Sequence, residues 1–252
     1  MPQARFSTSD LQYHEVAFGV DTYPPVELGD NQVRLNMFYE EGRNRWPTRF
    51  HRLSTSEGEF TISGAFRRAG VQGGPKSEFP TFQLTKRGPF FSLPIQLPEP
   101  LGMTGVDENP IGDFQKVRSL FASAVPDVKF MRVGMVRKLL FATGKAPCFN
   151  LFTKKSERFN ARLTGGSTKF LYRDGTCNIN VHLDVVDVLK QTQLAIGATV
   201  TDSTGYGLQV ILDVNNAELK PLSDDDIEMV LTRACGLWPD ALLSFLNEGN
   251  EP

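Results

Sequence analysis

Residues 177–184 read Cys-Asn-Ile-Asn-Val-His-Leu-Asp and alternate between apolar and polar side chains. A period of two is typical of a β-strand with one buried and one exposed face. It places Asn178, Asn180, His182 and Asp184 together on one face of that strand. A strand of this kind restricts the chain to a sheet that is covered on one side, which is typical of antiparallel sheets.

Other segments carry the same pattern or a helical one. We expect further strands at residues 12–20, 59–66, 81–85, 129–141, 170–172, 194–201 and 208–214. Turn signals at 174–175 and 202–205 join the later strands into an antiparallel set. Helices are expected at about 30–45, at 111–124 and from Ser223, where Asp226 completes a capping box. The predicted fold class is therefore α+β, an antiparallel sheet with helices packed on one face.

A proline-rich segment divides the chain. It contains Pro89, Pro94, Pro98, Pro100 and Pro110. Proline lacks a backbone donor, so we expect neither a helix nor a central strand there. We interpret the segment as a connector between an N-terminal α+β half, residues 1–105, and a C-terminal α+β half, residues 106–252. One continuous domain is the alternative.

The composition excludes several classes of protein. A content of 19 phenylalanines and a net charge of −2 are unlike a disordered chain. The most apolar run, residues 130–141, is interrupted by basic residues, so no membrane span is expected. The start of the chain has no apolar signal segment. Three widely spaced cysteines, Cys148, Cys177 and Cys235, fit a reducing cytoplasm.

Charge is strongly segregated along the chain. Residues 129–173 contain 11 basic residues and one acid, Glu157, whereas residues 174–252 contain 13 acids and 3 bases. The two blocks either neutralise each other within the fold, or form opposite faces that favour assembly, or offer a basic face to an anionic polymer. The candidate anion- or partner-binding residues in the basic block are Arg132, Arg137, Lys138, Lys154, Lys155, Arg158 and Arg162. Phe152 or Phe159 would stack on bases if the polymer were a nucleic acid.

Two local features are candidate sites. The polar strand face of Asn178, Asn180, His182 and Asp184 either lines a binding cleft or is the solvated side of a sheet. Residues 164–169, Thr-Gly-Gly-Ser-Thr-Lys, either form an anion-binding nest of backbone N–H groups or an ordinary hairpin loop.

Familiar catalytic and cofactor motifs are missing from the sequence. The 3 histidines have no His or Cys partner at metal-ligand spacing, and no dinucleotide-binding or nucleophile-elbow motif occurs. The glycine-rich residues 70–77 resemble a phosphate loop, but Pro75 removes a donor that such a loop uses. We therefore expect no cofactor, no metal site and no recognisable catalytic residue.

Four segments carry a resemblance to known proteins: residues 15–20, 35–47, 132–136 and 212–214. They resemble a sporadically distributed, uncharacterised family of bacterial proteins of similar length. That family has Pro-Pro just before the first segment, which this chain lacks, and residues 50–126 show no likeness. The resemblance implies a bacterial accessory role and brings no activity or site residue.

Three functions follow as hypotheses. The first is a non-catalytic cytoplasmic interaction or assembly protein that contacts a protein partner, or a second copy of itself, through its segregated charges. The second is a nucleic-acid-binding protein that uses the basic residues 129–173. The third is an enzyme of unfamiliar type with a site at His182 and Asp184.

Overall fold

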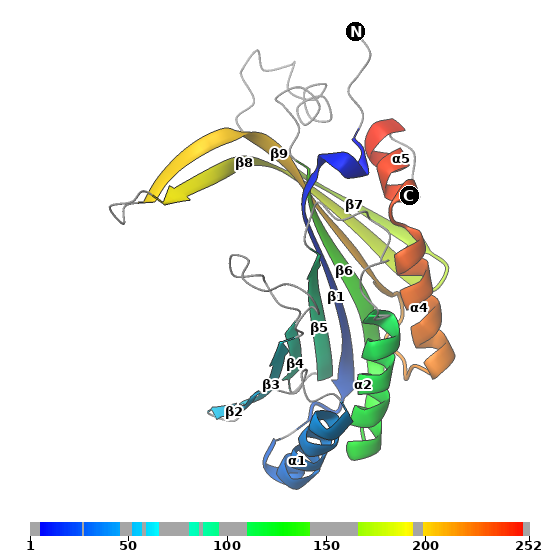
Figure 1. The fold of residues 1–252 in the computed structure, drawn as a ribbon. Coiled ribbons are helices and arrows are strands. Elements are labelled where there is room, and N and C mark those ends of the chain that lie inside the picture. Colours follow the sequence, from blue (N-terminus) through cyan, green and yellow to red (C-terminus); the bar gives the residue numbers. More distant parts are fainter. Residues whose placement is uncertain are drawn as a thin grey trace.

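Nine antiparallel strands form one sheet in the part of the chain that the computed structural model describes (Figure 1). The described residues are 6–26, 28–45, 52–56, 59–65, 81–85, 88–95, 110–141, 166–193 and 199–248. The elements, in chain order, are η1 (Thr8–Asp10), β1 (Leu11–Tyr23), α1 (Leu28–Arg45), β2 (Arg52–Ser56), β3 (Glu59–Ala65), β4 (Thr81–Thr85), β5 (Gly88–Ile95), α2 (Pro110–Ala124), β6 (Lys129–Phe141), β7 (Gly166–Asp174), β8 (Cys177–Gln193), β9 (Thr199–Asn216), α4 (Asp224–Gly236) and α5 (Asp240–Glu248). The α+β class expected from the sequence is confirmed.

The first strand of the chain lies in the interior of the sheet. The strand order is β2-β3-β4-β5-β1-β6-β9-β8-β7. β1 pairs with β5 on one side, where Gly19 lies opposite Phe90. On its other side it pairs with β6 along almost its whole length, and there Gly19 lies opposite Gly134. Strands from both sides of position 105 therefore belong to one sheet.

Strand alternation separates a buried face of the sheet from a half-exposed one. In β6, Val133, Met135 and Leu139 are fully buried, whereas Val136 and Lys138 are only half-buried. The described parts of β8 and β9 alternate in the same way up to Val214. Figure 1 shows α2, α4 and α5 on one side of the sheet, and the buried residues of these helices form one cluster with those of the strands. The core therefore lies between the sheet and these helices.

Aromatic contacts fix the helices on the core. Phe114 of α2 stacks on Phe18 of β1, with ring centroids 5.7 Å apart. Phe245 of α5 meets Phe170 of β7 edge to face at 5.3 Å. Burying a phenylalanine side chain stabilises a fold by about 1.5–3 kcal/mol. These contacts hold the helices to strands that are far apart in the sequence.

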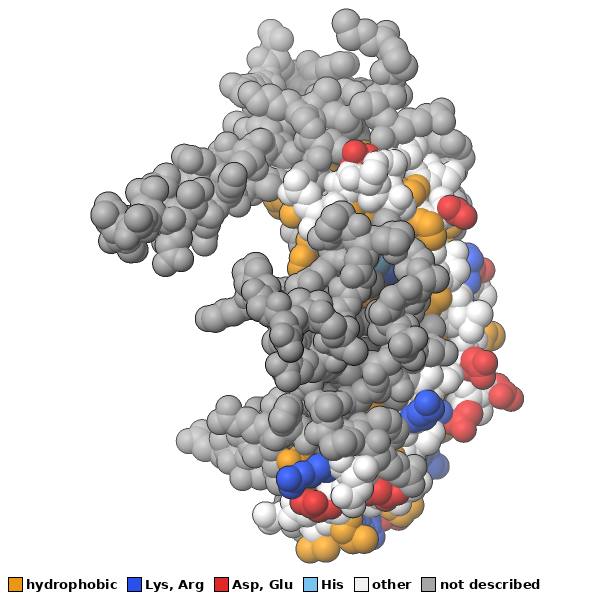
Figure 2. Space-filling model, in the orientation of Figure 1, with side chains coloured by type: hydrophobic (Ala, Val, Ile, Leu, Met, Phe, Trp, Pro, Cys, Tyr) orange, Lys and Arg blue, Asp and Glu red, His pale blue; other side chains and the backbone are white. Residues whose placement is uncertain are grey.

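The predicted start of α4 is confirmed. The Ser223 Oγ accepts from the Asp226 backbone N–H at 3.1 Å, and the Ser223 N–H donates to Asp226 Oδ2 at 3.0 Å. These two bonds form the capping box that the sequence predicts, and they satisfy donors that the first helical turn leaves free. The first turn also contains Asp224 and Asp225, and Figure 2 shows acidic side chains gathered on the surface over this end of α4. Negative charge is favoured there because it complements the helix dipole.

The interpretation of the proline-rich segment as free of strand is wrong for residues 88–95. These residues form β5, which lies between β4 and β1. In the register of the sheet, Pro89 pairs only with β4, and Pro94 pairs only with β1. Because the neighbouring strands are staggered, each proline occupies a position with one paired neighbour, where a missing donor is tolerated. Residues 96–109 lie outside the described residues.

The predicted turn at residues 202–205 is also wrong, because β9 runs unbroken through it. The pairing with β8 passes from Val188 opposite Gly205 to Leu189 opposite Ser203, so Thr204 has no opposite residue. A β-bulge therefore absorbs the turn-forming sequence inside the strand. The connection between β8 and β9 spans residues 194–198, where the sequence predicted a strand and which lie outside the described residues.

No single helix in the described part of the chain is long and apolar enough to cross a membrane. Within the same residues, α4 and α5 taken together have the length and composition of a span, and the chain bends by 49° between them.

Candidate functional site

The side of the sheet that faces away from α2, α4 and α5 is rich in polar side chains, and we call it the polar face. The structure places Asn178, Asn180, His182 and Asp184 on it, all half-buried, while the residues between them in β8 are buried in the core. Among the residues whose side chains the structure describes, the charged members of the polar face are Glu15, Asp21, Arg132, Lys138, Lys169, Arg173, Asp184 and Asp213.

Hydrogen bonds join amide and carboxylate groups across β8 and β9. The two oxygens of Asp213 accept from the amides of Asn180, at 3.2 Å, and Asn215, at 3.1 Å. The Asn178 amide in turn donates to Asn215 Oδ1 at 3.2 Å. Each bond restricts the rotamers of its two side chains, so the group presents fixed donors and acceptors.

Asp213 and Asn215 were not among the predicted site residues. The alternation of β9, Val-Ile-Leu-Asp-Val-Asn from Val210, carries the signal that would have found them. What the sequence does not contain is the register that sets Asn180 opposite Asp213 and Asn178 opposite Asn215.

A Ser–His–Asp set lies on the polar face near the edge of the sheet. Ser167 Oγ is 2.7 Å from His182 Nε2, and Asp184 Oδ1 is 3.3 Å from the same nitrogen. In a catalytic triad the carboxylate binds the ring nitrogen that faces away from the serine and so orients the base. Here both groups compete for Nε2. The geometry gives no support to nucleophilic chemistry at His182 and Asp184.

The segment 164–169 is not a loop where the structure describes it. Residues 166–169 are extended and belong to β7, which pairs with β8. An anion nest needs consecutive N–H groups that converge, and an extended strand points them alternately to opposite sides. Both sequence interpretations, the nest and the hairpin loop, are therefore wrong for residues 166–169, while Thr164 and Gly165 lie outside the described residues.

The prediction that Arg137 binds an anion or a partner is wrong, because this residue lies in the core. Only 7% of it is exposed. Its position in β6 has the same parity as the buried Val133 and Leu139, so strand alternation points it toward the helices. It cannot contact an external phosphate or protein.

The other basic candidates divide into two groups. Arg132 is exposed on the polar face, and Lys138 Nζ lies 3.5 Å from Glu15 Oε2. The remaining candidates lie outside the described residues: Lys154, Lys155, Arg158 and Arg162. Of the three candidates that the structure describes, Arg132 and Lys138 lie on the polar face and Arg137 lies in the core.

Arg137 forms a polar cluster in the core with His14 and Trp238. Its Nη1 lies 2.6 Å from His14 Nε2, and its guanidinium lies over the Trp238 ring at 5.8 Å from the centroid. Since a guanidinium only donates, Nε2 accepts and the ring proton is assigned to Nδ1. Within the described part of the chain, that Nδ1 and Arg137 Nε have no hydrogen-bond partner.

Burial sets the charges of this cluster. Burial, with the positive charge of Arg137 as a second cause, lowers the pKa of His14 to about 3. Burial also lowers the pKa of Arg137 to about 10. At neutral pH the cluster is therefore one buried positive charge beside a neutral imidazole.

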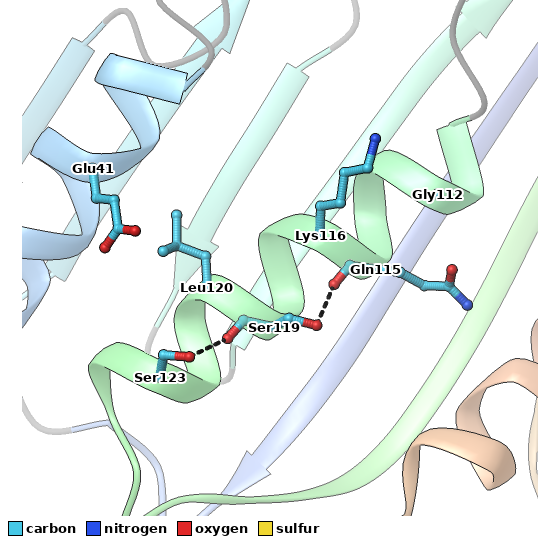
Figure 3. A pocket seen from close by; sticks show the side chains of 7 residues that line it. All are labelled: Glu41, Gly112, Gln115, Lys116, Ser119, Leu120 and Ser123. Atoms are coloured by element: carbon cyan, nitrogen blue, oxygen red, sulfur yellow. Dashed lines mark hydrogen bonds between the residues drawn. The ribbon is translucent and has the colours of Figure 1, made fainter.

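A groove of about 630 Å³ lies between α1 and α2 (Figure 3). Both hydroxyls of its described lining are used within α2, because Ser119 Oγ donates to Gln115 O at 2.9 Å and Ser123 Oγ donates to Ser119 O at 3.0 Å. Glu41 of α1 and Lys116 of α2 supply its charges. The groove therefore offers a mixed polar wall rather than a set of converging catalytic groups.

Comparisons with protein-family models, with curated proteins and with solved structures find no match. In the described part of the chain no group of three or more His, Cys, Asp or Glu side chains is arranged to hold a metal ion. The geometry of the polar face is therefore the basis on which a function can be proposed.

Proposed function

We propose that this protein is a non-catalytic interaction protein, a subunit of a protein complex, whose partner binds the polar face of the sheet. One observation carries the proposal. The helices α2, α4 and α5 lie on the other face, while the polar face displays the hydrogen-bonded amide and carboxylate groups of Asn178, Asn180, Asp213 and Asn215 (Figure 1). Side chains that are already fixed lose little entropy when a partner binds them.

The charge of the polar face favours a protein as partner. Among the residues whose side chains the structure describes, the polar face contains the bases Arg132, Lys138, Lys169 and Arg173 and the same number of acids. Two of these cations already have acidic partners, since Lys138 contacts Glu15 and Arg173 contacts Glu218. A mixed surface is complementary to another mixed surface, whereas a polyanion requires an excess of positive charge.

The hypothesis of nucleic-acid binding depends mainly on basic residues that are not in the described part of the polar face. Its remaining candidates, Lys154, Lys155, Arg158 and Arg162, lie outside the described residues. We also propose that the protein belongs to the sporadically distributed bacterial family and that it is cytoplasmic. Neither proposal implies an enzymatic activity.

A comparison of bait variants by native mass spectrometry tests the proposal. Baits of the wild type, of Asn180→Arg and of Glu228→Arg are each incubated with extract of the source cells and recovered. Asn180 belongs to the hydrogen-bonded group of the polar face, on β8, while Glu228 is exposed on α4. We expect a defined protein complex with the wild type and with Glu228→Arg, resistant to nuclease, and its loss with Asn180→Arg.

Two outcomes would contradict the proposal. If Asn180→Arg retains the complex, the partner binds elsewhere on the molecule. If the recovered material disappears after nuclease treatment and weakens steeply with salt, the partner is a nucleic acid.

A further inference from the structure

The strands β8 and β9 extend well beyond the rest of the sheet. They pair with each other from Cys177 opposite Asn216 to Gln193 opposite Thr199. The pairing of β7 with β8 ends at Val185, and the pairing of β6 with β9 ends at Leu208. Beyond these points no other described strand lies beside them. We call residues 186–193 together with residues 199–207 the arm.

The arm is long for a structure of two strands. Eight residues of β8 at about 3.3 Å each span roughly 26 Å. Figure 1 shows the arm leaving the sheet and curving away from the helices. A ribbon of two strands is at best marginally stable in water, and three or more strands are normally needed. The arm is therefore a segment that gains stability when another strand joins it.

The two edges of the arm differ. The β9 edge contains the bulge at Thr204, which interrupts the regular spacing of backbone donors and acceptors. The β8 edge runs through residues 186–193 with one β9 residue opposite each, and its sequence contains no proline. A regular edge without proline or bulge is the kind that accepts a further strand. Within the described residues, the β8 edge is thus the one open to pairing.

We propose that the arm joins two copies of this chain by antiparallel pairing of their β8 edges. A two-fold axis perpendicular to the strands always sets two identical edges antiparallel, so their donors and acceptors match without any other sequence. The product is a four-stranded ribbon in the order β9-β8-β8-β9, which has more than the three strands that an independently stable sheet normally needs. The contact is closed, so it gives a dimer and not a fibre.

The sequence of β8 permits such a register. With the two-fold axis at Leu189, Asp187 of one copy stands opposite Gln191 of the other, and Val186 stands opposite Thr192, so these pairs lie beyond Val185, where the pairing with β7 ends. No like charges are then directly opposed, which would destabilise the pairing. This proposal is independent of the partner on the polar face, because it uses a strand edge and backbone groups.

The oligomeric state in solution tests the proposal. We compare the wild type with a shortened chain in which Asn-Gly replaces residues 187–206, a turn that links Val186 to Gly207. Sedimentation equilibrium should show the wild type in a monomer–dimer equilibrium in the micromolar range, since the contact is small. The shortened chain should be monomeric. A wild type that is monomeric at several hundred micromolar, or a shortened chain that still forms dimers, would overturn the proposal.

Single proline substitutions test the same contact if the shortened chain does not fold. Backbone N–H groups alternate between the two sides of a strand, so one of Gln191→Pro and Thr192→Pro removes a donor from the free edge of β8. That variant should weaken dimerisation at least about tenfold, the order of one lost backbone hydrogen bond. Thr204→Pro, at the bulge of β9, is the matched control and should leave dimerisation within twofold.

Dimerisation that neither β8 variant weakens more than Thr204→Pro does would show that the β8 edge is not the contact. Asn180→Arg should leave the dimer intact, which separates this test from that of the polar face.

Discussion

Arg137 holds a positive charge inside the hydrophobic core, and no ion pair of Arg137 occurs within the described residues. Taking a cation out of water costs several kcal/mol unless close partners replace the water. The partners seen here are the neutral imidazole of His14 and the ring of Trp238, and Arg137 Nε bonds to no described residue. The buried charge of the cluster therefore opposes folding.

We predict that Arg137→Met raises the free energy of unfolding by about 1–3 kcal/mol, because an apolar side chain of similar length fills the space without the desolvation cost. Urea unfolding at pH 7 measures the change. Arg137→Ala is the control, and it should lower stability because it leaves a cavity. If Arg137→Met is also destabilising by more than about 1 kcal/mol, the charge has a compensating partner that the cluster does not reveal.

His14 makes the stability depend on pH. Its pKa is lowered to about 3 by burial first and by Arg137 second, whereas an unfolded histidine titrates near 6.5. Between these values the unfolded chain binds the proton and the folded chain does not, so stability falls as pH drops. We predict a loss of up to about 1.4 kcal/mol per pH unit from pH 6.5 toward 3. In His14→Gln this share of the slope should vanish; an unchanged slope in urea unfolding would assign it to other groups.

The sequence anticipated part of the candidate site. Alternation alone grouped Asn178, Asn180, His182 and Asp184, because parity within one strand is a local property. Ser167 and Asp213 come from neighbouring strands, and their contacts depend on a register that only the folded sheet defines. Arg137 was misplaced for a different reason, because its charge was given more weight than its position in the strand.

Helices and strands were predicted correctly where local sequence specifies them, and wrongly where their neighbours in the sheet decide. The helices α2 and α4 and the strand β6 agree with their predictions because hydrophobic period and capping residues specify them locally. β5 was missed since the stagger of β4 and β1 is what makes Pro89 and Pro94 acceptable. β9 was cut in two because a bulge can hold a turn-forming sequence within a strand.

The capping box of α4 gives a prediction at the scale of one element. Ser223→Ala removes the oxygen that accepts from the Asp226 N–H, so we expect a loss of about 1 kcal/mol in the free energy of unfolding. Ser119→Ala in α2 is the matched control. Its hydroxyl bonds only to the backbone of its own helix among the bonds seen here, and its removal should change stability by less than about 0.5 kcal/mol. Equal losses in both variants would mean that the box adds nothing to the stability of α4.

At the scale of the molecule, the structure shows how the opposite charge blocks meet. Arg173 from the basic block contacts Glu218 from the acidic block at 3.5 Å. β6 and β7 of the basic block also pair directly with β9 and β8 of the acidic one. The described strands of the two blocks are therefore neighbours within one sheet, and the pair of Arg173 with Glu218 cancels part of the segregation along the sequence.

The same sheet links the two halves that the sequence separates at about residue 105. The β1–β6 pair runs from Leu11 opposite Phe141 to Tyr23 opposite Lys129, so neither half can open its sheet without exposing the other's backbone. We therefore predict one cooperative unfolding unit. Hydrogen exchange at rising urea concentration should show amides of β5, β1, β6 and β9 approaching one common opening free energy. If β5 opens at a lower urea concentration while β6 and β9 stay protected, the chain contains two domains that meet at β1.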